Sequence, residues 1–322
     1  MKRRILSIFV VITVFLLGTS VFAVDETTDK TEEVITEAYV YKVVPGSKEW
    51  ESFHGPEEKL AASYVPPETM EKMSTEALVK TVLNYPLLVD IYAYNSIEIG
   101  IQAVSTYFGG IEELMSRQDA AEVLYEYSLK ETARTNDTDI TYFYCDTLLD
   151  YISTEKAKES RAIQFTETTV ETPNGSEVDA YYNLTWSNHG TSYAEVYAID
   201  QQFLATYPSA SIVANPSPSY NCHSYAWHSQ STSNKYWIDD PSLYMTDGSY
   251  SGCVVAIGCK VFYDSTNDLY NHSGVTTGLP SGGNPSVVTS KWGCHSLFSH
   301  YVDDCPYVNT GYSTVVGCWS RN

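Results

Sequence analysis

Apolar residues recur at helical spacing through the first half of the chain. In the segment 74–83 the apolar residues lie three and four positions apart and share one helical face. The segment 96–108 carries a similar pattern and is closed by two glycines. These patterns predict two helices. Ser116 followed by Asp119 predicts the start of a third helix just before Ala120.

Near residue 160 the pattern changes to short runs that are rich in Thr, Tyr, Ser, Asn and Gly. Such runs on both sides of Pro173-Asn-Gly175 predict a β-hairpin over residues 167–177. Residues 191–206 are also predicted to form a helix. The strands predicted beyond it are 254–263, 273–277 and 285–290.

Helices followed by a cysteine-bearing helix and a run of strands predict an α+β fold. We expect a mostly helical N-terminal domain over residues 46–155 and a catalytic domain over residues 160–322. Residues 24–45 begin acidic and Thr-rich and then alternate Tyr and Val, so they predict a solvated acidic linker that ends in a short strand. No internal repeat is visible.

The N-terminus MKRRILSIFVVITVFLLGTSVFA has the features of a signal peptide. Three basic residues precede an apolar run, and small residues follow it up to Ala23. Cleavage there would remove residues 1–23 and leave 322 − 23 = 299 residues. The alternative is an uncleaved membrane anchor, for which the apolar run is short. We therefore expect a secreted protein, extracellular or at the cell surface.

The chain is strongly acidic, with a net charge of −21. Loss of the three basic residues of the signal peptide leaves 16 Lys and Arg against 40 Asp and Glu, a net charge of −24. A nucleic-acid partner is excluded, since it requires a basic surface. Binding to anionic lipid is disfavoured for the same reason, so no membrane contact is expected after cleavage.

The chain has seven cysteines: Cys145, Cys222, Cys253, Cys259, Cys294, Cys305 and Cys318. Each could be half of a disulfide, a metal ligand or a nucleophile. In an exported protein some of them are expected to form disulfides, and an odd number leaves one thiol over. Structural zinc needs closely spaced pairs, and the adjacent pairs Cys222-His223 and Cys294-His295 do not provide them. No metal and no cofactor are therefore expected.

Cys222 is the candidate nucleophile. It stands where the Pro-rich connector 215–218 runs into the short helical sequence Ser-Tyr-Ala-Trp. A helix start and a nearby imidazole lower the pKa of a thiol, so we expect a reactive thiolate. His223 and His228 are too close along the same helix to face the thiol, and we interpret them as surface or supporting residues.

His272 is the candidate base, because it begins a predicted strand and can face a cysteine at a helix start. A third polar residue should orient its imidazole. Ser290 is the first choice, and Lys291 and His300 are the alternatives.

The order of these residues resembles the NlpC/P60 family of papain-like cysteine peptidases. Asn221-Cys222-His223-Ser224-Tyr225 is similar to the family's Asp-Cys-Ser-Gly-aromatic motif, and His272-Ser-Gly-Val275 to its His-Val-Gly-Ile strand. Ser290-Lys-Trp-Gly293 resembles the Asn-Ser-Trp-Gly turn of papain-like enzymes. Together with Cys305-Pro-Tyr307, these motifs also resemble a group of uncharacterised exported bacterial proteins. The resemblance covers about residues 215–307.

The resemblance implies a papain-like catalytic domain, in which a helix bearing the cysteine lies on an antiparallel sheet. It also implies peptidoglycan stem peptides as substrate, with a surface peptide as the alternative. The expected activity is hydrolysis of an amide bond by Cys222 and His272. The backbone N–H of Cys222, assisted by Tyr220 or Asn221, would stabilise the oxyanion. The alternative function is a non-enzymatic, disulfide-stapled surface protein with a degenerate papain-like fold.

Overall fold

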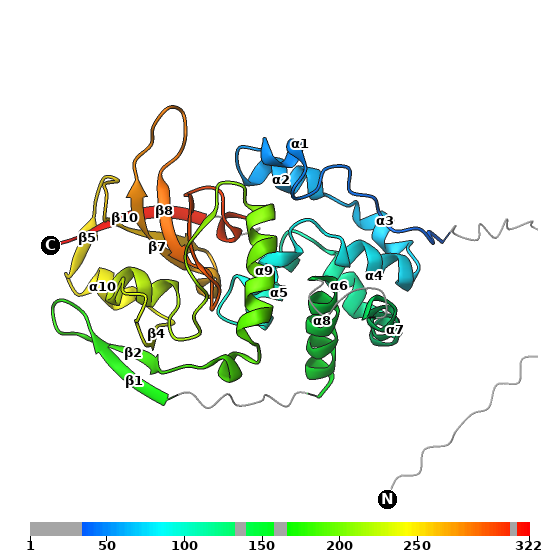
Figure 1. Ribbon diagram of the computed structural model, residues 1–322, viewed down its shortest axis with the longest axis horizontal. Helices are drawn as coiled ribbons and strands as arrows, with labels where there is room; N and C mark the ends of the chain where they lie inside the picture. Colours follow the sequence, from blue (N-terminus) through cyan, green and yellow to red (C-terminus); the bar gives the residue numbers. More distant parts are fainter. Residues whose placement is uncertain (1–33, 133–139, 158–165, 310–313) are drawn as a thin grey trace, which may run out of the picture. The chain divides into compact units, whose positions relative to one another are not determined.

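The computed structural model in Figure 1 describes residues 34–132, 140–157, 166–309 and 314–322. The predicted signal peptide and the first part of the predicted linker lie outside these residues. The segment from Val34 to Asn322 forms one compact unit. Within the described part of the chain, no helix is both long enough and apolar enough to cross a membrane.

The first half of the described chain is helical, as its apolar spacing predicts. The elements are α1 (Lys48–Glu51), α2 (Pro56–Ser63), α3 (Pro67–Glu71), α4 (Thr75–Leu83), η1 (Leu88–Tyr92), α5 (Ile97–Ser105), α6 (Gly110–Ser116), α7 (Ala120–Thr132) and α8 (Ile140–Ala157). Helices α4, α6, α7 and α8 group together, as Figure 1 shows.

Local capping explains where the two predicted helices begin. Ser74 accepts a hydrogen bond from the backbone N–H of Ala77 and caps α4. Ser96 caps α5 by accepting from Ile99 in the same way. The apolar face of α4 is buried. Both predicted helices are therefore confirmed.

Two details of this half differ from the prediction. The helix predicted to start before Ala120 is confirmed as α7, but Ser116 does not cap it. Ser116 is the last residue of α6, and its hydroxyl donates to the carbonyl of Glu113. The short strand predicted before residue 46 is wrong, because Ile35 makes only an isolated bridge to Met73 and residues 36–45 form no strand.

The predicted hairpin is confirmed. Strands β1 (Thr166–Glu171) and β2 (Glu177–Tyr182) pair antiparallel, and Gly175 turns the chain between them with a φ of 86°. β4 (Tyr236–Trp237) adds a third strand alongside β2. The short η2 helix (Trp186–His189) follows the hairpin.

The helix predicted over 191–206 is confirmed as α9 (Tyr193–Thr206). Ser192 and Glu195 form a reciprocal capping box at its start. Its buried residues Ile199 and Phe203 pack into the larger core.

A seven-stranded sheet carries the second half of the chain, in the order β3-β9-β8-β7-β6-β10-β5. Every neighbouring pair in it is antiparallel. The strands are β3 (Ser211–Ala214), β5 (Tyr250–Gly252), β6 (Lys260–Ser265), β7 (His272–Gly278), β8 (Val287–Lys291), β9 (Leu297–Tyr301) and β10 (Thr314–Arg321). Short helical segments η3 (Ser224–His228), α10 (Ser242–Thr246), η4 (Asp268–Tyr270) and η5 (Pro306–Val308) connect them.

Among the predicted strands, 273–277 and 285–290 are confirmed as β7 and β8. The prediction 254–263 is right only in its second half. β6 begins at Lys260, because the preceding residues form a loop that Gly258 turns with a φ of 84°. The pattern did not predict β3, β5, β9 or β10.

The two faces of the sheet serve two hydrophobic cores, as β6 shows. Val261 and Tyr263 belong to the larger core, whereas Phe262 between them belongs to the smaller one. The larger core also contains buried residues of α4 to α8, so helices and sheet share it. The smaller core contains Trp227 and its neighbours on η3. The α+β class is therefore confirmed.

Candidate active site

Cys222 lies in the first turn of a short buried helical segment that continues into η3. Asn221 precedes it, and the Asn221 side chain accepts hydrogen bonds from the backbone N–H groups of Ser224 at 3.1 Å and Ile238 at 3.2 Å. The Asn221 amide nitrogen donates to the carbonyl of Ile238 at 2.6 Å. Asn221 therefore fixes the turn and holds Cys222 in place. Tyr220, the other expected oxyanion residue, is also buried here.

The Cys222 thiol is buried, with 3% of the residue exposed. Burial raises the pKa of Cys222 to about 12, although backbone hydrogen bonds from Ser273, His223 and Cys222 itself act to lower it. The expected low-pKa thiolate is therefore not present in this closed arrangement. The backbone contact with Ser273 places the sulfur at the peptide that joins His272 to Ser273.

His272 begins β7 and is fully buried. Its ring lies flat against Tyr307, with ring centroids 3.5 Å apart and an interplanar angle of 8°. Neither ring nitrogen has a hydrogen-bond partner within the described part of the chain. Burial first, and then the charges of His300 and His223, hold the pKa of His272 well below its usual value. The imidazole is therefore neutral at neutral pH.

Cys222 and His272 lie at the same end of β7, but no hydrogen bond joins them. Tyr307 lies next to both residues. Its ring stacks on His272. Burial raises the pKa of Tyr307, and the nearby charge of Cys222 raises it further. The alternation of β7 directs His272 towards Tyr263 and Tyr307, while Ser273 faces Trp227.

Ser273 explains the position of His223. The Ser273 hydroxyl accepts from the indole N–H of Trp227 at 2.8 Å and lies 2.8 Å from Nδ1 of His223. Burial lowers the pKa of His223 to about 4, so the ring is neutral and can accept the hydroxyl proton. His223 is therefore a buried supporting residue, whereas His228 is half-buried.

Ser290 is bound to His300 rather than to His272. The Ser290 hydroxyl lies 2.8 Å from Nε2 of His300, and the indole N–H of Trp292 donates to it at 3.1 Å. Nδ1 of His300 lies 2.7 Å from the carbonyl of Tyr301, which assigns the ring proton to Nδ1. The hydroxyl of Ser290 then donates to Nε2.

The glycine after Ser273 lets β7 and β8 approach closely on this side. Gly274 pairs with Ser290, and a Cβ at Gly274 would stand 2.4 Å from Val288 Cγ1 and 3.2 Å from Ser290 Cβ. The charge of His300 acts on His272, so the two histidines and Ser290 share one region of the sheet. The sequence led us to expect Ser290 to orient His272, whereas the Ser290 hydroxyl contacts His300.

Lys291 lies on the other face of β8 and borders the cysteine. Its ammonium donates to the carbonyls of Ser217 at 3.0 Å, Gly293 at 3.3 Å and His295. Burial lowers the pKa of Lys291 to about 8, while the charges of neighbouring groups, Cys222 among them, act to raise it. Lys291 is thus a buried cation that fixes the Pro-rich connector close to Cys222.

Two features of the site were not expected from the sequence. The first is the contact of Tyr307, a residue of the Cys305-Pro-Tyr307 motif, whose hydroxyl donates to the carbonyl of Ala93. The second is the segment after η1, where Asn95 lies 3.4 Å from the side chains of both Asn221 and Asp239. A Cβ at Gly293 would stand 2.7 Å from the carbonyl oxygen of Tyr94. The helical half therefore covers the loops around Cys222.

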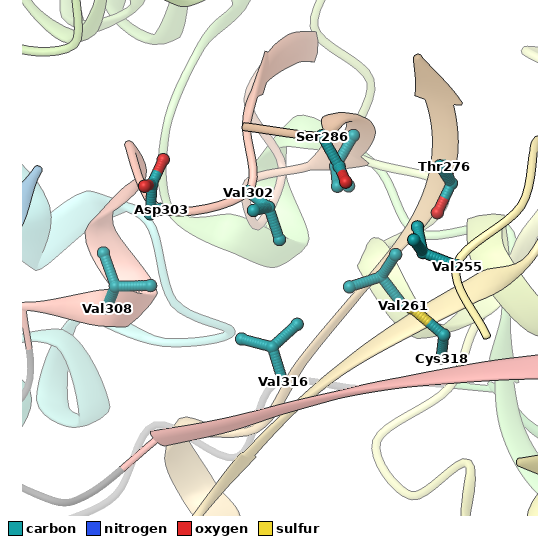
Figure 2. Close-up of a pocket in the computed structure, with 10 residues that line it drawn as sticks. Val255, Val261, Thr276, Ser286, Val302, Asp303, Val308, Val316 and Cys318 are labelled. Carbon is teal, nitrogen blue, oxygen red and sulfur yellow. The ribbon is translucent and has the colours of Figure 1, made fainter. Parts of the chain in front are cut away.

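An apolar pocket of about 280 Å³ lies elsewhere on the sheet (Figure 2). Val261, Thr276, Val288 and Val316 line it, together with Cys318. Its lining includes none of the candidate catalytic residues. In the described residues, no group of three or more His, Cys, Asp or Glu side chains is placed to hold a metal ion.

Comparisons with protein-family models, with curated proteins and with solved structures find no match to this chain.

Proposed function

We propose that this chain is a thiol hydrolase of papain-like, NlpC/P60-type architecture that cleaves an amide bond, with Cys222 as nucleophile and His272 as base. The observation that carries the proposal is the state of His272. A buried polar group without a hydrogen bond costs about 1–3 kcal/mol, so it calls for an explanation, of which a catalytic role is one. Both nitrogens of His272 are in this state, beside the peptide that contacts Cys222.

The architecture around the site supports the same proposal. A short helical segment carries Cys222 at its first turn and packs on an antiparallel sheet whose central strand begins with His272. This is the arrangement that the motif resemblance implies for a papain-like domain. The chain also supplies a polar third position at Ser290 and a buried cation at Lys291.

The reaction begins from a neutral thiol and a neutral imidazole. No hydrogen bond joins His272 to Cys222 in this structure. Proton transfer needs one, so substrate binding must bring the His272 ring into contact with the thiol. His272 takes the thiol proton as the sulfur attacks the amide carbonyl. The backbone N–H of Cys222 stabilises the oxyanion, with Tyr220 and Asn221 adjacent. His272 then donates its proton to the leaving amine, and water hydrolyses the thioester.

The motif resemblance favours peptidoglycan stem peptides as substrate, and a surface peptide is the alternative. The net charge of −21 disfavours long contact with an anionic polymer. It is compatible with a short stem peptide or with a neutral or basic peptide released from its polymer. Such a substrate fits an exported protein, as the N-terminal sequence predicts.

The second candidate is a non-enzymatic, disulfide-stapled surface protein that keeps the fold. Two observations favour it: Cys222 is buried with a raised pKa, and the sulfurs of Cys253 and Cys259 lie 3.1 Å apart. The two candidates differ in the state of Cys222, because a nucleophile must be a free thiol.

The test uses the secreted full chain incubated with muropeptides and, separately, with a denatured protein digest. Mass spectrometry then searches for new amine and carboxyl ends. We expect cleavage by the parent and none by Cys222→Ala, while the matched variant Cys145→Ala keeps it. Cleavage that survives Cys222→Ala, or a native disulfide at Cys222, refutes the hydrolase.

A further inference from the structure

Two thiols lie close together at the two ends of the loop between β5 and β6. The sulfurs of Cys253 and Cys259 lie 3.1 Å apart, and no disulfide joins them in the structure. Cys253 follows β5, and Cys259 precedes β6. Because a disulfide has a sulfur–sulfur distance of about 2 Å, a displacement of about 1 Å would close this pair.

Hydrogen bonds to neighbouring strands fix both ends of this loop. The backbone N–H of Cys253 donates to the carbonyl of Cys318 on β10 at 2.9 Å. The carbonyl of Cys259 accepts from Thr276 on β7 at 2.9 Å, and Gly258 donates to the carbonyl of Thr276 at 2.8 Å. The sheet therefore brings the two sulfurs together, and Gly258 with a φ of 84° supplies the turn that this requires.

We infer that Cys253 and Cys259 are an oxidisable pair that forms a disulfide within this loop by exchange with an external disulfide. The Cys253 thiol, the more accessible of the two, loses its proton and attacks one sulfur of the external disulfide, which releases one thiolate. The Cys259 thiolate then attacks Cys253 and releases the second thiolate. The two protein protons end on the two released thiols, and the two electrons go to the external disulfide.

Cys318 is the competing partner, because it is opposite Cys253 across the β5–β10 pair, where a Cα spacing of about 5.5 Å also suits a disulfide. The sulfur–sulfur contact of Cys253 is nevertheless made with Cys259. Cys318 instead lines the apolar pocket, beside Val261 in Figure 2. Burial and then the contact with Cys259 raise the pKa of Cys253, and the charge of Cys318 comes after them.

A disulfide between Cys253 and Cys259 would restrict the loop that borders the pocket. Val255 belongs to this loop and lines the pocket. Val254 and Ile257 are exposed by 87% and 61%, so the loop presents an apolar tip to solvent. A disulfide at its base holds this tip and the Val255 wall in one conformation. The inference is independent of the proposed hydrolase, because neither thiol contacts Cys222 or His272.

Tryptic peptide mapping tests the pairing directly. Cleavage after Lys235 and Lys260 yields peptide 236–260, which contains both thiols, whereas Cys318 lies in peptide 292–321. The full chain is equilibrated with oxidised glutathione, denatured, alkylated without reductant and digested. We expect peptide 236–260 to lose both alkyl groups and to be lighter than the reduced peptide by two hydrogen atoms, and reductant should restore both groups.

Matched variants complete the test. Cys318→Ser should leave formation of the Cys253–Cys259 disulfide unchanged. Cys253→Ser should abolish it and leave Cys259 alkylated or joined to glutathione. The inference is overturned if both thiols of the parent stay alkylated, or if peptide 236–260 is instead linked to peptide 292–321.

Discussion

The imidazole of His272 and the phenol of Tyr307 lie face to face, 3.5 Å apart between ring centroids. Tyr307 also donates its hydroxyl to the carbonyl of Ala93, from the helical half of the chain. One tyrosine therefore joins the candidate base to the segment that covers the site. We therefore expect the exposure of Cys222 to depend on the contact between Tyr307 and the helical half of the chain.

Removal of the Tyr307 hydroxyl should open this cover. Tyr307→Phe keeps the stacked ring but leaves the carbonyl of Ala93 without its donor, at a cost of about 1 kcal/mol. We expect alkylation of Cys222 at mildly alkaline pH to become about fivefold faster, as mass spectrometry of the labelled peptide would measure. The control is Tyr64→Phe, since Tyr64 is exposed. An unchanged rate at Cys222 would show that this contact does not limit access.

Cys222 and His272 should act as one catalytic unit. We expect Cys222→Ala to abolish amide hydrolysis and His272→Ala to lower the rate by at least about 100-fold. The double variant should be little worse than Cys222→Ala alone, because members of one unit are not additive. Steady-state assays of the three variants measure this, with His228→Ala as the control. Full activity of His272→Ala would exclude the Cys–His mechanism.

The third residue can be assigned by comparing Ser290 with His300. Because Ser290 donates to His300 in the structure, Ser290→Ala removes one hydrogen bond of about 1 kcal/mol and should lower the rate about fivefold. If His300→Ala is the more damaging change, the orienting role passes to His300. The pH profile of kcat/KM distinguishes this role from a loss of stability, because only an orienting residue changes the profile of the base.

Local sequence patterns predicted several helices and the candidate residues Cys222 and His272. They did not predict that the helical half of the chain covers Cys222. Serine caps and apolar spacing are local signals, which is why α4, α5 and α9 were found. The contact of Tyr307 with Ala93 joins residues 214 positions apart, and no local pattern encodes it. A helix start and a nearby imidazole predict a low pKa for the Cys222 thiol. Burial outweighs that effect, and it depends on the whole fold.

β9 was not predicted, for a related reason. β9 is short and has buried residues at consecutive positions, so it lacks clear alternation. Its place between β3 and β8 comes from tertiary pairing. The apolar residues of 254–259 favour the first half of the strand predicted over 254–263, whereas Gly258 turns this segment into a loop.

His300 should make the protein less stable in mild acid. Burial lowers the pKa of His300 from 6.5 to about 4, so the unfolded state binds a proton that the folded state does not in this window. Its contribution to stability is complete above 6.5 and is lost as the pH falls through 4. His300→Gln should therefore reduce the pH slope of the unfolding free energy by about 1.4 kcal/mol per pH unit near pH 5. Urea unfolding at neutral pH and at about pH 5 would measure it, and equal slopes would contradict it.

A buried ion pair between the helical half and the sheet half should stabilise the protein as one unit. Lys59 on α2 is fully buried, pairs with Asp304 after β9, and lies 4.4 Å from the ring centroid of Tyr207. Lys59→Met leaves the carboxylate without its cation, which should lower the unfolding free energy by about 3 kcal/mol.

The matched control is Lys80→Met, because Lys80 pairs with Glu76 on the exposed surface of α4 and should contribute less than about 0.5 kcal/mol. Far-ultraviolet circular dichroism and tryptophan fluorescence would follow urea unfolding of both variants. Since helices and sheet share the larger core, both probes should shift together in Lys59→Met. Separate transitions, with only the helical signal shifted, would show that the halves unfold independently despite the shared core.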